Sequence, residues 1–507
     1  MDPDGILQDG INSQAVFSFV LYLLVVVAIG VYASKFSSRG ISEYFIGGRK
    51  INRYVMALSA VVSGRSAWLL LGVTGMAYSI GAQAVWAVVG YIVIEVFLFL
   101  YYARRLRRYS GIRDCITVPD FFASRFKSHA TTIRLVLVFI ILVFMVGYVS
   151  AQFVAGGKTF AASFGLRENT GIVITAAIVL LYTLIGGFLA VSLTDMVQAV
   201  LMLLALVILP ALIIYDAGGW QVIVNELKNL DINLADPYAL TTGAAISALG
   251  IGLGSPGNPH IISRYLSIED EKQLKIACLV GTFWNILMAW GALFIGLAGR
   301  ALFPEVEMLP GADTENLFAF LAQAYFPPVV FGLVVASVFA AIMSSADSQL
   351  LVAASGVVRD FYEKIWHKNK NLSQRLLVKA SRTVVFGLVV LALLIGFLAE
   401  DLVYWLVLFA WAGLGAAIGP TSILALYWKR TTGPGIIWGM ITGSGLTIVW
   451  RLTESLRDIT YELIPGFIAA FVVTVVVSLL TQPPENAAEE MELMSISKPE
   501  KINCSTP

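Results

Sequence analysis

Apolar stretches of about the length needed to cross a bilayer recur along the whole chain, separated by short polar segments. A membrane-spanning helix needs about 20 mostly apolar residues. Thirteen stretches come close to or exceed that length, and we number them as spans 1 to 13: residues 15–34, 55–80, 84–103, 133–156, 169–189, 195–215, 242–262, 276–300, 318–346, 383–399, 402–427, 434–450 and 461–481. The pattern predicts an all-α polytopic membrane protein with thirteen transmembrane helices.

Positive charge is distributed unevenly between the polar segments. If the N-terminus lies outside, the connections facing the cytoplasm are 35–54, 104–134, 264–275, 358–382, 429–430 and the C-terminal tail. These segments hold 27 of the 34 Lys and Arg residues, whereas the opposite connections hold six. Because Lys and Arg are enriched in cytoplasmic loops, we expect a multi-pass protein of the plasma (cytoplasmic) membrane, with its N-terminus outside and its C-terminus inside.

Composition supports a membrane protein and argues against several functional classes. Hydrophobic residues make up 58% of the chain and charged residues 13%, with a mean hydropathy of +0.81, whereas soluble proteins carry about 25% charged residues. The net charge of +1 gives no reason to expect a nucleic-acid partner. Three scattered cysteines and three scattered histidines predict no metal or cofactor site, and no cluster of side chains suggests an enzyme. The N-terminus lacks the basic region of a cleavable signal peptide.

Two of the predicted spans are interrupted near their middles by small or helix-breaking residues. Span 2 contains the segment 57–68 (ALSAVVSGRSAW), and span 7 contains 250–259 (GIGLGSPGNP). Glycine costs about 1 kcal/mol and proline about 3 kcal/mol in a helix interior. Such residues either let helices pack closely or mark unwound backbone beside a polar cavity. Paired breaks in two halves of a chain indicate a transporter's binding site.

The positions of the two breaks predict an inverted repeat. Spans 2–6 and spans 7–11 each contain five helices, so the second set starts on the opposite side of the membrane. We therefore expect five regions: 1–54 (external N-terminus, first helix and cytoplasmic loop), 55–215 (first repeat), 242–427 (second repeat), 428–481 (two peripheral helices) and 482–507 (a disordered cytoplasmic tail). The tail is polar and contains several prolines, which is typical of disorder.

Seven segments in a characteristic order carry a resemblance to a known family. They are EYFIGGR (43–49), ALSA (57–60), TVPDFFASRF (117–126), IGGFLAVSLTDMVQA (185–199), GNPHIISRY (257–265), AAIMSSADSQLLV (340–352) and WAGLGAAIGP (411–420). With them the chain resembles the solute:sodium symporter family, most closely its sodium/proline symporter branch. The resemblance covers nearly the whole chain and implies a leucine-transporter-like inverted-repeat core that alternates between outward-open and inward-open states.

The resemblance also implies a sodium site between spans 2 and 9. Carried onto this sequence, its ligands are the carbonyls of Val62, Arg65 and Ala341 and the hydroxyls of Ser344 and Ser345. Sodium is a hard cation, and hydroxyls with freed carbonyls supply the oxygen ligands that it needs. The alternative reading of the serine pair is hydrogen bonding between helices.

Three further residues belong to the implied ion pathway. Asp195, at the cytoplasmic start of span 6, matches an aspartate implicated in sodium passage or release, although it is also placed to cap a helix N-terminus. Asp347 lies two residues after Ser345 and is a candidate for the same pathway or for a second ion. Tyr148 matches a tyrosine tied to ion coupling in the proline branch; otherwise it is a packed aromatic residue.

The sequence departs from that branch where its members carry aspartate and methionine, because this chain has Gly64 and Arg65 there. An arginine at membrane depth needs a partner or a wet cavity. Arg65 either clamps a substrate carboxylate, pairs with a protein carboxylate such as Asp347, or replaces a coupling ion. Span 7 departs as well: the branch has aromatic residues at the positions of Ile251 and Ser255.

These considerations give a set of candidate substrate-binding residues: Ser63, Gly64, Arg65, Ser66, Trp68, Gln152, Ile251, Ser255 and Pro259. Gln152 is also read as a polar residue that helps helices to pack. The favoured hypothesis is sodium-coupled symport of a small carboxylate-bearing solute, such as proline or another amino acid. The alternatives are sodium-coupled uptake of a neutral sugar or polyol, and sodium-independent transport with Arg65 in place of an ion. Expected partners are the solute, sodium and the lipid bilayer, with a monomer as the functional unit.

Overall fold

The computed structural model describes residues 12–37, 40–368, 370, 372–399 and 402–495. Within these residues the fold is helical, and the one strand-like pairing is an isolated bridge between Ile51 and Ile268. Ten helical segments of the described chain are long and apolar enough to cross a membrane. The prediction of an all-helical membrane protein is therefore confirmed, while expectations about residues 1–11 and 496–507 fall outside the described part.

Most helices follow the predicted apolar stretches. The continuous ones are α1 (Ser13–Ser37), α8 (Ala130–Phe164), α13 (Leu274–Leu302), α16 (Gln374–Gly396), α17 (Val403–Tyr427), α18 (Gly433–Leu452) and α20 (Leu463–Leu480). α9 (Glu168–Asp216) is interrupted by a kink. The segmented ones are α3 (Arg53–Ser63) with η3 (Trp68–Val73) and α4 (Thr74–Ile80), α5 (Val85–Phe97) with η5 (Leu98–Tyr102) and α6 (Ala103–Ile112), α11 (Thr242–Gly250) with η8 (Ile251–Gly257) and α12 (Pro259–Ser267), and α15 (Pro328–Ser355) with η13 (Gly356–Trp366). Short connecting helices include α2 (Ile41–Ile46), α7 (Val118–Arg125), α10 (Trp220–Leu230), α14 (Leu317–Tyr325), α19 (Glu454–Arg457) and α21 (Ala487–Ser495).

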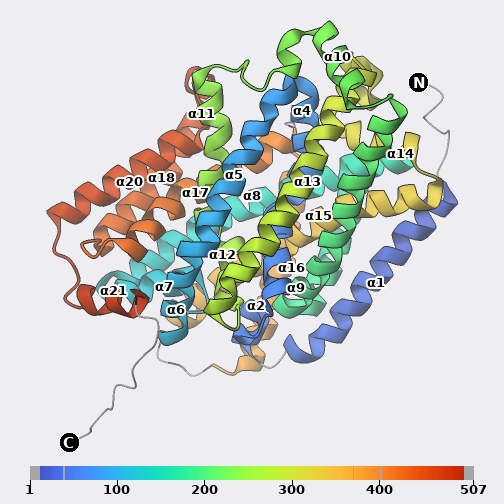
Figure 1. Ribbon diagram of the computed structural model, residues 1–507. Helices are drawn as coiled ribbons and strands as arrows, with labels where there is room; N and C mark the ends of the chain where they lie inside the picture. Colours follow the sequence, from blue (N-terminus) through green and yellow to red (C-terminus); the bar gives the residue numbers. More distant parts are fainter. Residues whose placement is uncertain (1–11, 38–39, 369, 371, 400–401, 496–507) are drawn as a thin grey trace, which may run out of the picture.

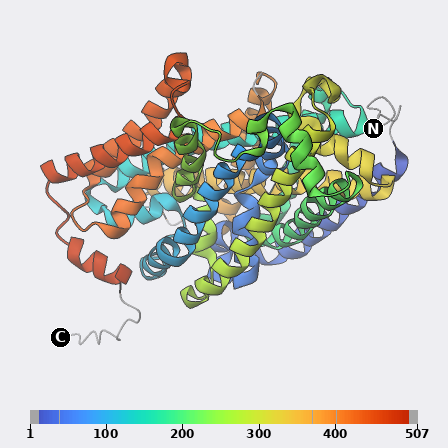
Figure 2. The same ribbon diagram turned by 45° about the horizontal axis from the view of Figure 1, so that its top comes forward.

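The helices form a bundle around α15, which packs on α1, α8 and α9. η8 is held between α17 and α5, so the broken segment of span 7 lies inside the bundle. α18 and α20 pair with each other at one edge of the molecule, and α1 lies at the opposite edge (Figures 1 and 2). α15 and α17 are largely buried, which places the candidate site residues in the most enclosed part of the bundle.

Three predicted spans have different boundaries in the structure. Spans 5 and 6 lie in α9, which consists of two helices joined at a kink at Gly187, where the backbone is not helical and the φ of 61° is readily available only to glycine. Span 9 was expected at 318–346, but α14 ends at Tyr325 and α15 begins with Pro328. Proline has no backbone N–H and disfavours helical backbone before it, so Pro327 and Pro328 separate the two helices.

The count of thirteen crossings stays a prediction. The shorter apolar segments Arg53–Ser63 and Glu168–Leu184 fall below the length required of a continuous spanning helix, and span 7 is divided at η8. These are the places where the sequence contains breaks or a sharp bend. Counting only continuous helices that are long enough to cross a membrane therefore gives fewer spans than the apolar pattern of the sequence predicts.

The C-terminal tail is not disordered over all of its described length, which corrects the expectation for 482–507. Residues 487–495 form α21, whose Glu490 is buried. Glu490 pairs with Arg113 at 2.5 Å, and Arg108 donates to the carbonyl of Met494 at 3.3 Å. The acidic helix thus docks on basic residues at the end of α6, a tertiary interaction that tail composition does not reveal.

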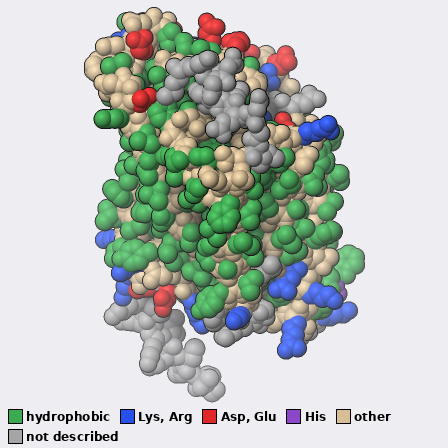
Figure 3. Space-filling model, turned by 90° about the vertical axis from the view of Figure 1, so that its right-hand side faces the viewer, with side chains coloured by type: hydrophobic (Ala, Val, Ile, Leu, Met, Phe, Trp, Pro, Cys, Tyr) green, Lys and Arg blue, Asp and Glu red, His purple; other side chains and the backbone are tan. Residues whose placement is uncertain are grey.

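Charged side chains gather at the two ends of the molecule. In Figure 3 the middle of the visible face is hydrophobic, Lys and Arg side chains lie mainly at the lower end, and Asp and Glu gather mainly at the upper end. α2, α6 and α21 lie at the lower end, and α10, α11 and α14 at the upper end (Figure 1). We call these ends the basic end and the acidic end.

Candidate functional site

The first break interrupts span 2 inside the bundle. α3 ends at Ser63, and regular helix resumes only after Ser66, whose φ of 49° lies in the left-handed region. A residue other than glycine is strained there. The N–H of Ala67 donates to Oε1 of Gln152 at 3.1 Å. The predicted break is confirmed, and a side chain from α8 stabilises the exposed backbone.

The second break interrupts span 7 beside α17. α11 is followed by η8, and α12 begins with Pro259. A Cβ atom on Gly254 would lie 1.9 Å from Nε1 of Trp411, so this close approach requires glycine. The same Nε1 donates to the carbonyl of Ile251 at 2.8 Å. This predicted break is also confirmed, and the glycines serve close packing as well as unwinding.

The serine pair of span 9 meets the break of span 2. The hydroxyl of Ser345 donates to the carbonyl of Ser63 at 2.9 Å, and that of Ser344 donates to the carbonyl of Ala341 at 3.1 Å. All four residues are buried. The structure therefore brings together two elements that are about 280 residues apart in sequence, as the predicted ion site requires.

The other two predicted sodium ligands are backbone carbonyls at the same break. The carbonyl of Val62 accepts the N–H of Arg65 at 3.0 Å, and the carbonyl of Arg65 accepts the N–H of Leu69 at 3.1 Å. A carbonyl oxygen has two lone pairs. Each of these oxygens therefore keeps one lone pair available for a cation.

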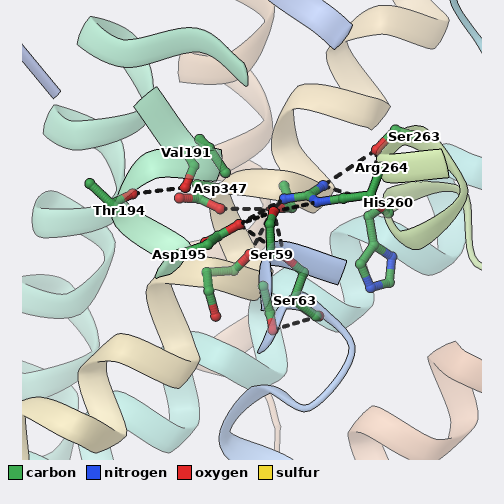
Figure 4. A network of polar contacts seen from close by, with 12 residues as sticks. Ser59, Ser63, Val191, Thr194, Asp195, His260, Ser263, Arg264 and Asp347 are labelled. Atoms are coloured by element: carbon green, nitrogen blue, oxygen red, sulfur yellow. Dashed lines mark hydrogen bonds and ion pairs between the residues drawn. The ribbon is translucent and has the colours of Figure 1, made fainter. Parts of the chain in front are cut away.

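Asp195 lies at the centre of a buried polar cluster (Figure 4). Its Oδ2 accepts hydrogen bonds from Ser59 at 2.6 Å and from Ser63 at 3.3 Å, and it pairs with Nη2 of Arg264 at 3.2 Å. Arg264 also donates to the hydroxyl of Ser348. The cluster joins α3, α9, α12 and α15, so it links both broken spans to the helix that carries the serine pair.

Two expectations about this cluster are corrected by the structure. Asp195 is not a helix cap, because it lies within α9 eight residues beyond the bend at Gly187. Arg264 was counted among cytoplasmic loop residues, but α12 continues to Ser267 and the arginine is 1% exposed. The sequence signal for Arg264 was its place in the segment GNPHIISRY.

Asp347 lies beside Asp195 in Figure 4. Its Oδ1 accepts a hydrogen bond from Ser348 at 3.0 Å, and its Oδ2 has no hydrogen-bond partner among the described residues. A buried carboxylate oxygen without a partner is costly. The two carboxylates and the neighbouring hydroxyls therefore provide several oxygen atoms close to the predicted sodium ligands.

Arg65 does not pair with Asp347, which corrects one reading of this arginine. Its Nη2 forms an ion pair with Glu95 of α5, and its Nε donates to Oδ1 of Asn285 of α13 at 2.8 Å. Its guanidinium carbon lies 3.7 Å from the centre of the Tyr91 ring. Sequence reasoning identified Arg65 as needing a partner but missed Glu95 and Asn285.

A small aromatic cavity lies beside Arg65 between the two breaks. It is lined by Gly64, Arg65, Trp68, Tyr91, Tyr148, Ile251, Val407, Leu408 and Trp411. Five of these were predicted as site residues, whereas Tyr91 and the three residues of α17 were missed. The free volume is about 10 Å³, so the cavity is nearly closed in this conformation.

The remaining substrate candidates occupy different positions. Gln152 borders the break, and its Nε2 has no hydrogen-bond partner among the described residues. Ser66 accepts a hydrogen bond from the hydroxyl of Tyr148 at 3.4 Å. Ser63 belongs to the Asp195 cluster, and the hydroxyl of Ser255 is likewise without a partner in the described structure. Pro259 lines a separate small cavity, so the structure does not bring it to the aromatic cavity.

A larger vestibule lies toward the acidic end. Its volume is about 660 Å³, and its walls include Arg451 and Glu462. It shares Ile251 and Leu408 with the aromatic cavity, so these two side chains separate the chambers. Tyr404 lines the vestibule and stacks on Trp68 with ring centres 6.0 Å apart. A solute entering from the acidic end would reach the cavity past these residues.

The basic end is held together by ion pairs between α7, α8 and η13. Arg134 of α8 pairs with Asp120 at 2.6 Å and with Asp360, and Arg359 pairs with Asp120 at 3.2 Å. Burial acts to raise the pKa of Asp120, but the guanidinium groups of Arg359 and Arg134 lower that pKa below its usual value. Asp120 therefore stays ionised, and these contacts tie the helix ends together opposite the vestibule.

Comparison with known proteins gives consistent matches over nearly the whole chain. Residues 44–443 match the sequence profile described as the Sodium:solute symporter family. Sodium/proline symporters of Staphylococcus aureus strains JH9 and JH1 are each 38% identical over 483 residues, covering 93% of this chain and 94% of theirs.

Two solved structures share the fold at low sequence identity. A substrate-bound, outward-open Na⁺-coupled sialic acid symporter matches with a TM-score of 0.80 and 19% identity, covering 93% of this chain and 99% of that chain. A nucleobase-cation-symport-1 family transporter, in a closed conformation with bromovinylhydantoin bound, matches with a TM-score of 0.56 and 14% identity, covering 89% and 98%. The overall fold is thus one that these two structures share.

Proposed function

The chain belongs to the sodium:solute symporter family, and from this premise we propose that it carries a small amino-acid-like solute into the cell together with sodium by alternating access. As a member of this family, the chain is a multi-pass membrane transporter and not an enzyme. The observation that carries the proposal is the contact between the Ser345 hydroxyl and the Ser63 carbonyl at the break of span 2.

Sodium is proposed to bind where these two elements meet. Its ligands are the carbonyls of Val62, Arg65 and Ala341 and the hydroxyls of Ser344 and Ser345. Five neutral oxygens suit a hard monovalent cation without leaving a buried charge when the ion departs. Asp195 and Asp347 lie next to this position and are proposed to form the ion pathway or a second ion site, with Tyr148 at its border.

The solute is proposed to bind in the aromatic cavity. The similarity to sodium/proline symporters supports proline or a similar amino acid as the solute. Arg65 is engaged by Glu95, so a solute carboxylate would be held by neutral donors such as Nε1 of Trp68 and Nε2 of Gln152, both without partners in the described structure. The ion pair between Arg65 and Glu95 also supports a second candidate solute, an uncharged sugar or polyol. The same ion pair argues against the hypothesis that Arg65 replaces a coupling ion, because Glu95 cancels the charge of Arg65.

The finer architecture is also a proposal. We assign thirteen crossings, with spans 2–6 (55–215) and 7–11 (242–427) as inverted repeats and 428–481 as peripheral helices. The basic end faces the cytoplasm, which places the N-terminus outside and the C-terminus inside, in accord with the charge distribution. The functional unit is a monomer, since each chain holds both broken helices and the cavity between them.

Sodium dependence tests the proposal directly. In proteoliposomes, an inward sodium gradient should drive concentrative solute uptake. Replacing Ser344 and Ser345 together by alanine should raise the sodium concentration for half-maximal uptake about tenfold or more, because two of five ion ligands are lost and each hydrogen-bond-like contact to a charge is worth about 1.5–3 kcal/mol. Ser337→Ala is a matched control, because Ser337 is a buried hydroxyl on the same helix that donates to Val334 of its own helix. Uptake that is indifferent to sodium in the unaltered protein would refute sodium coupling.

The identity of the solute is tested by competition. Labelled L-proline and D-glucose are offered to proteoliposomes with a sodium gradient, and unlabelled amino acids, sugars and polyols compete. We expect L-proline or another small amino acid to inhibit most strongly, because the cavity is compact and aromatic and donors without partners lie at its border. Preferential inhibition by sugars or polyols would favour the second candidate.

A further inference from the structure

The guanidinium group of Arg65 contacts four groups of the protein. Nη2 pairs with Glu95, Nε donates to Asn285 at 2.8 Å, and Nη1 donates to the carbonyl of Gly64 at 3.3 Å. One face of the group lies over the Tyr91 ring at 3.7 Å. These contacts use three of the five N–H donors of the guanidinium group.

The contacts form a closed circuit between three helical elements. Asn285 accepts from Arg65 and donates from its Nδ2 to Oε2 of Glu95 at 2.6 Å. The three side chains come from the break of span 2, from α5 and from α13, and all are buried. An isolated charge at membrane depth costs at least a few kcal/mol, whereas this circuit has a net charge of zero. The amide of Asn285 fixes the geometry of the pair.

The circuit stands directly behind the wall of the aromatic cavity. Arg65 and Tyr91 line the cavity, but Glu95 and Asn285 do not. The carboxylate therefore holds the guanidinium from the side away from the solute. Among the described residues, Arg65 is the only one that lines the cavity and has a charged side chain, so Glu95 sets the net charge that the cavity presents.

We infer that Glu95 is a specificity-determining residue, which neutralises Arg65 so that the cavity selects solutes without net charge and rejects anions. The inference rests on the proposed function and narrows its substrate class to zwitterionic or uncharged solutes. Glu95 acts as a positioning residue, because it reaches the solute only through Arg65. If the guanidinium were released, it would provide a forked donor for a carboxylate, the geometry that arginine favours.

The test replaces Glu95 by glutamine, which keeps the size of the side chain and removes its charge. Acetate and succinate are the probes, added at constant ionic strength to purified protein, and binding is followed by the shift in thermal midpoint. The unaltered protein should respond to neither anion. E95Q should bind them about tenfold more tightly or better, since a charge-assisted contact is worth about that factor or more.

Three further variants separate charge from local disturbance. Asn285→Ala removes both hydrogen bonds of Asn285 in the circuit without changing the charge of the circuit, and this variant should gain no response to anions. Arg65→Met reverses the sign of the unpaired charge, because it leaves Glu95 without its cationic partner. This variant should gain a response to choline, a cation, and none to acetate. The double variant Arg65→Met/Glu95→Ala should respond to neither ion.

The outcomes distinguish this inference from the proposed function. Binding of acetate or succinate by the unaltered protein would overturn it, as would folded E95Q that gains no anion response. If E95Q does not fold, Arg65→Met and the neutral double variant decide by their response to choline. Anion binding is measured without a sodium gradient, so a failure of sodium-driven uptake would count against the proposed function alone.

Discussion

Removing either charge of the Arg65–Glu95 pair alone should destabilise the protein more than removing both. Breaking a buried ion pair costs about 3–5 kcal/mol, because the remaining charge stays buried without a partner, whereas replacing both partners with apolar side chains is often nearly neutral. We therefore expect Arg65→Met and Glu95→Ala each to lower the free energy of unfolding by about 3–5 kcal/mol. The double variant should recover most of that loss.

The measurement is a double-mutant cycle on purified protein in one detergent, read from denaturant or thermal unfolding monitored by tryptophan fluorescence. Asn285→Ala is the matched control, because it removes hydrogen bonds from the circuit and leaves both charges paired. It should cost about 1–3 kcal/mol. Additive effects of the two single replacements would show that Arg65 and Glu95 are not energetically coupled, contrary to the structure.

Asp195→Asn should abolish most sodium-driven transport. The substitution keeps the shape of the side chain and two of its hydrogen bonds, but it removes the charge that faces Arg264 at 3.2 Å and the predicted ion path. Two unit charges about 4 Å apart interact by about 4 kcal/mol at an effective dielectric constant of 20. We expect the initial rate of uptake to fall about tenfold or more, because part of that interaction suffices for such a change.

Uptake is measured in proteoliposomes over a range of sodium concentrations, with protein stability recorded for each variant. Ser59→Ala is the control, since it removes the 2.6 Å hydrogen bond to Asp195 and keeps the charge. It should reduce uptake less than Asp195→Asn does, because the charge of Asp195 and its ion pair with Arg264 remain. A stable Asp195→Asn protein with unchanged sodium response would remove Asp195 from the ion pathway.

Local sequence features were sufficient to predict the breaks in spans 2 and 7. Ser, Gly and Pro act on the backbone at their own positions, so their effect needs no knowledge of neighbouring helices. The same logic failed for Asp195, which the sequence placed at a possible helix start. The kink at Gly187 places the start of the second helix of α9 eight residues before Asp195, so Asp195 lies inside that helix and does not cap it.

The partner of Arg65 was within reach of sequence reasoning but was not found. Glu95 is the only charged residue between positions 84 and 103, inside predicted span 3. Two opposite charges at membrane depth are each costly alone, which makes a pair a natural expectation. Asp347 was given as an example of a carboxylate partner, but the sequence does not determine which helices touch.

The sequence by itself determined that the protein lies in a lipid bilayer, approximately where its helices lie and the two places where they unwind. The free energy of transferring a helix into a bilayer is close to a sum over its residues, and helix breaking is a property of single residues. Only the tertiary structure decided which charges meet: Arg65 with Glu95, Arg264 with Asp195, and Glu490 with Arg113. The partners in each pair lie on different helical elements, and their pairing depends on the register and rotation with which those elements pack.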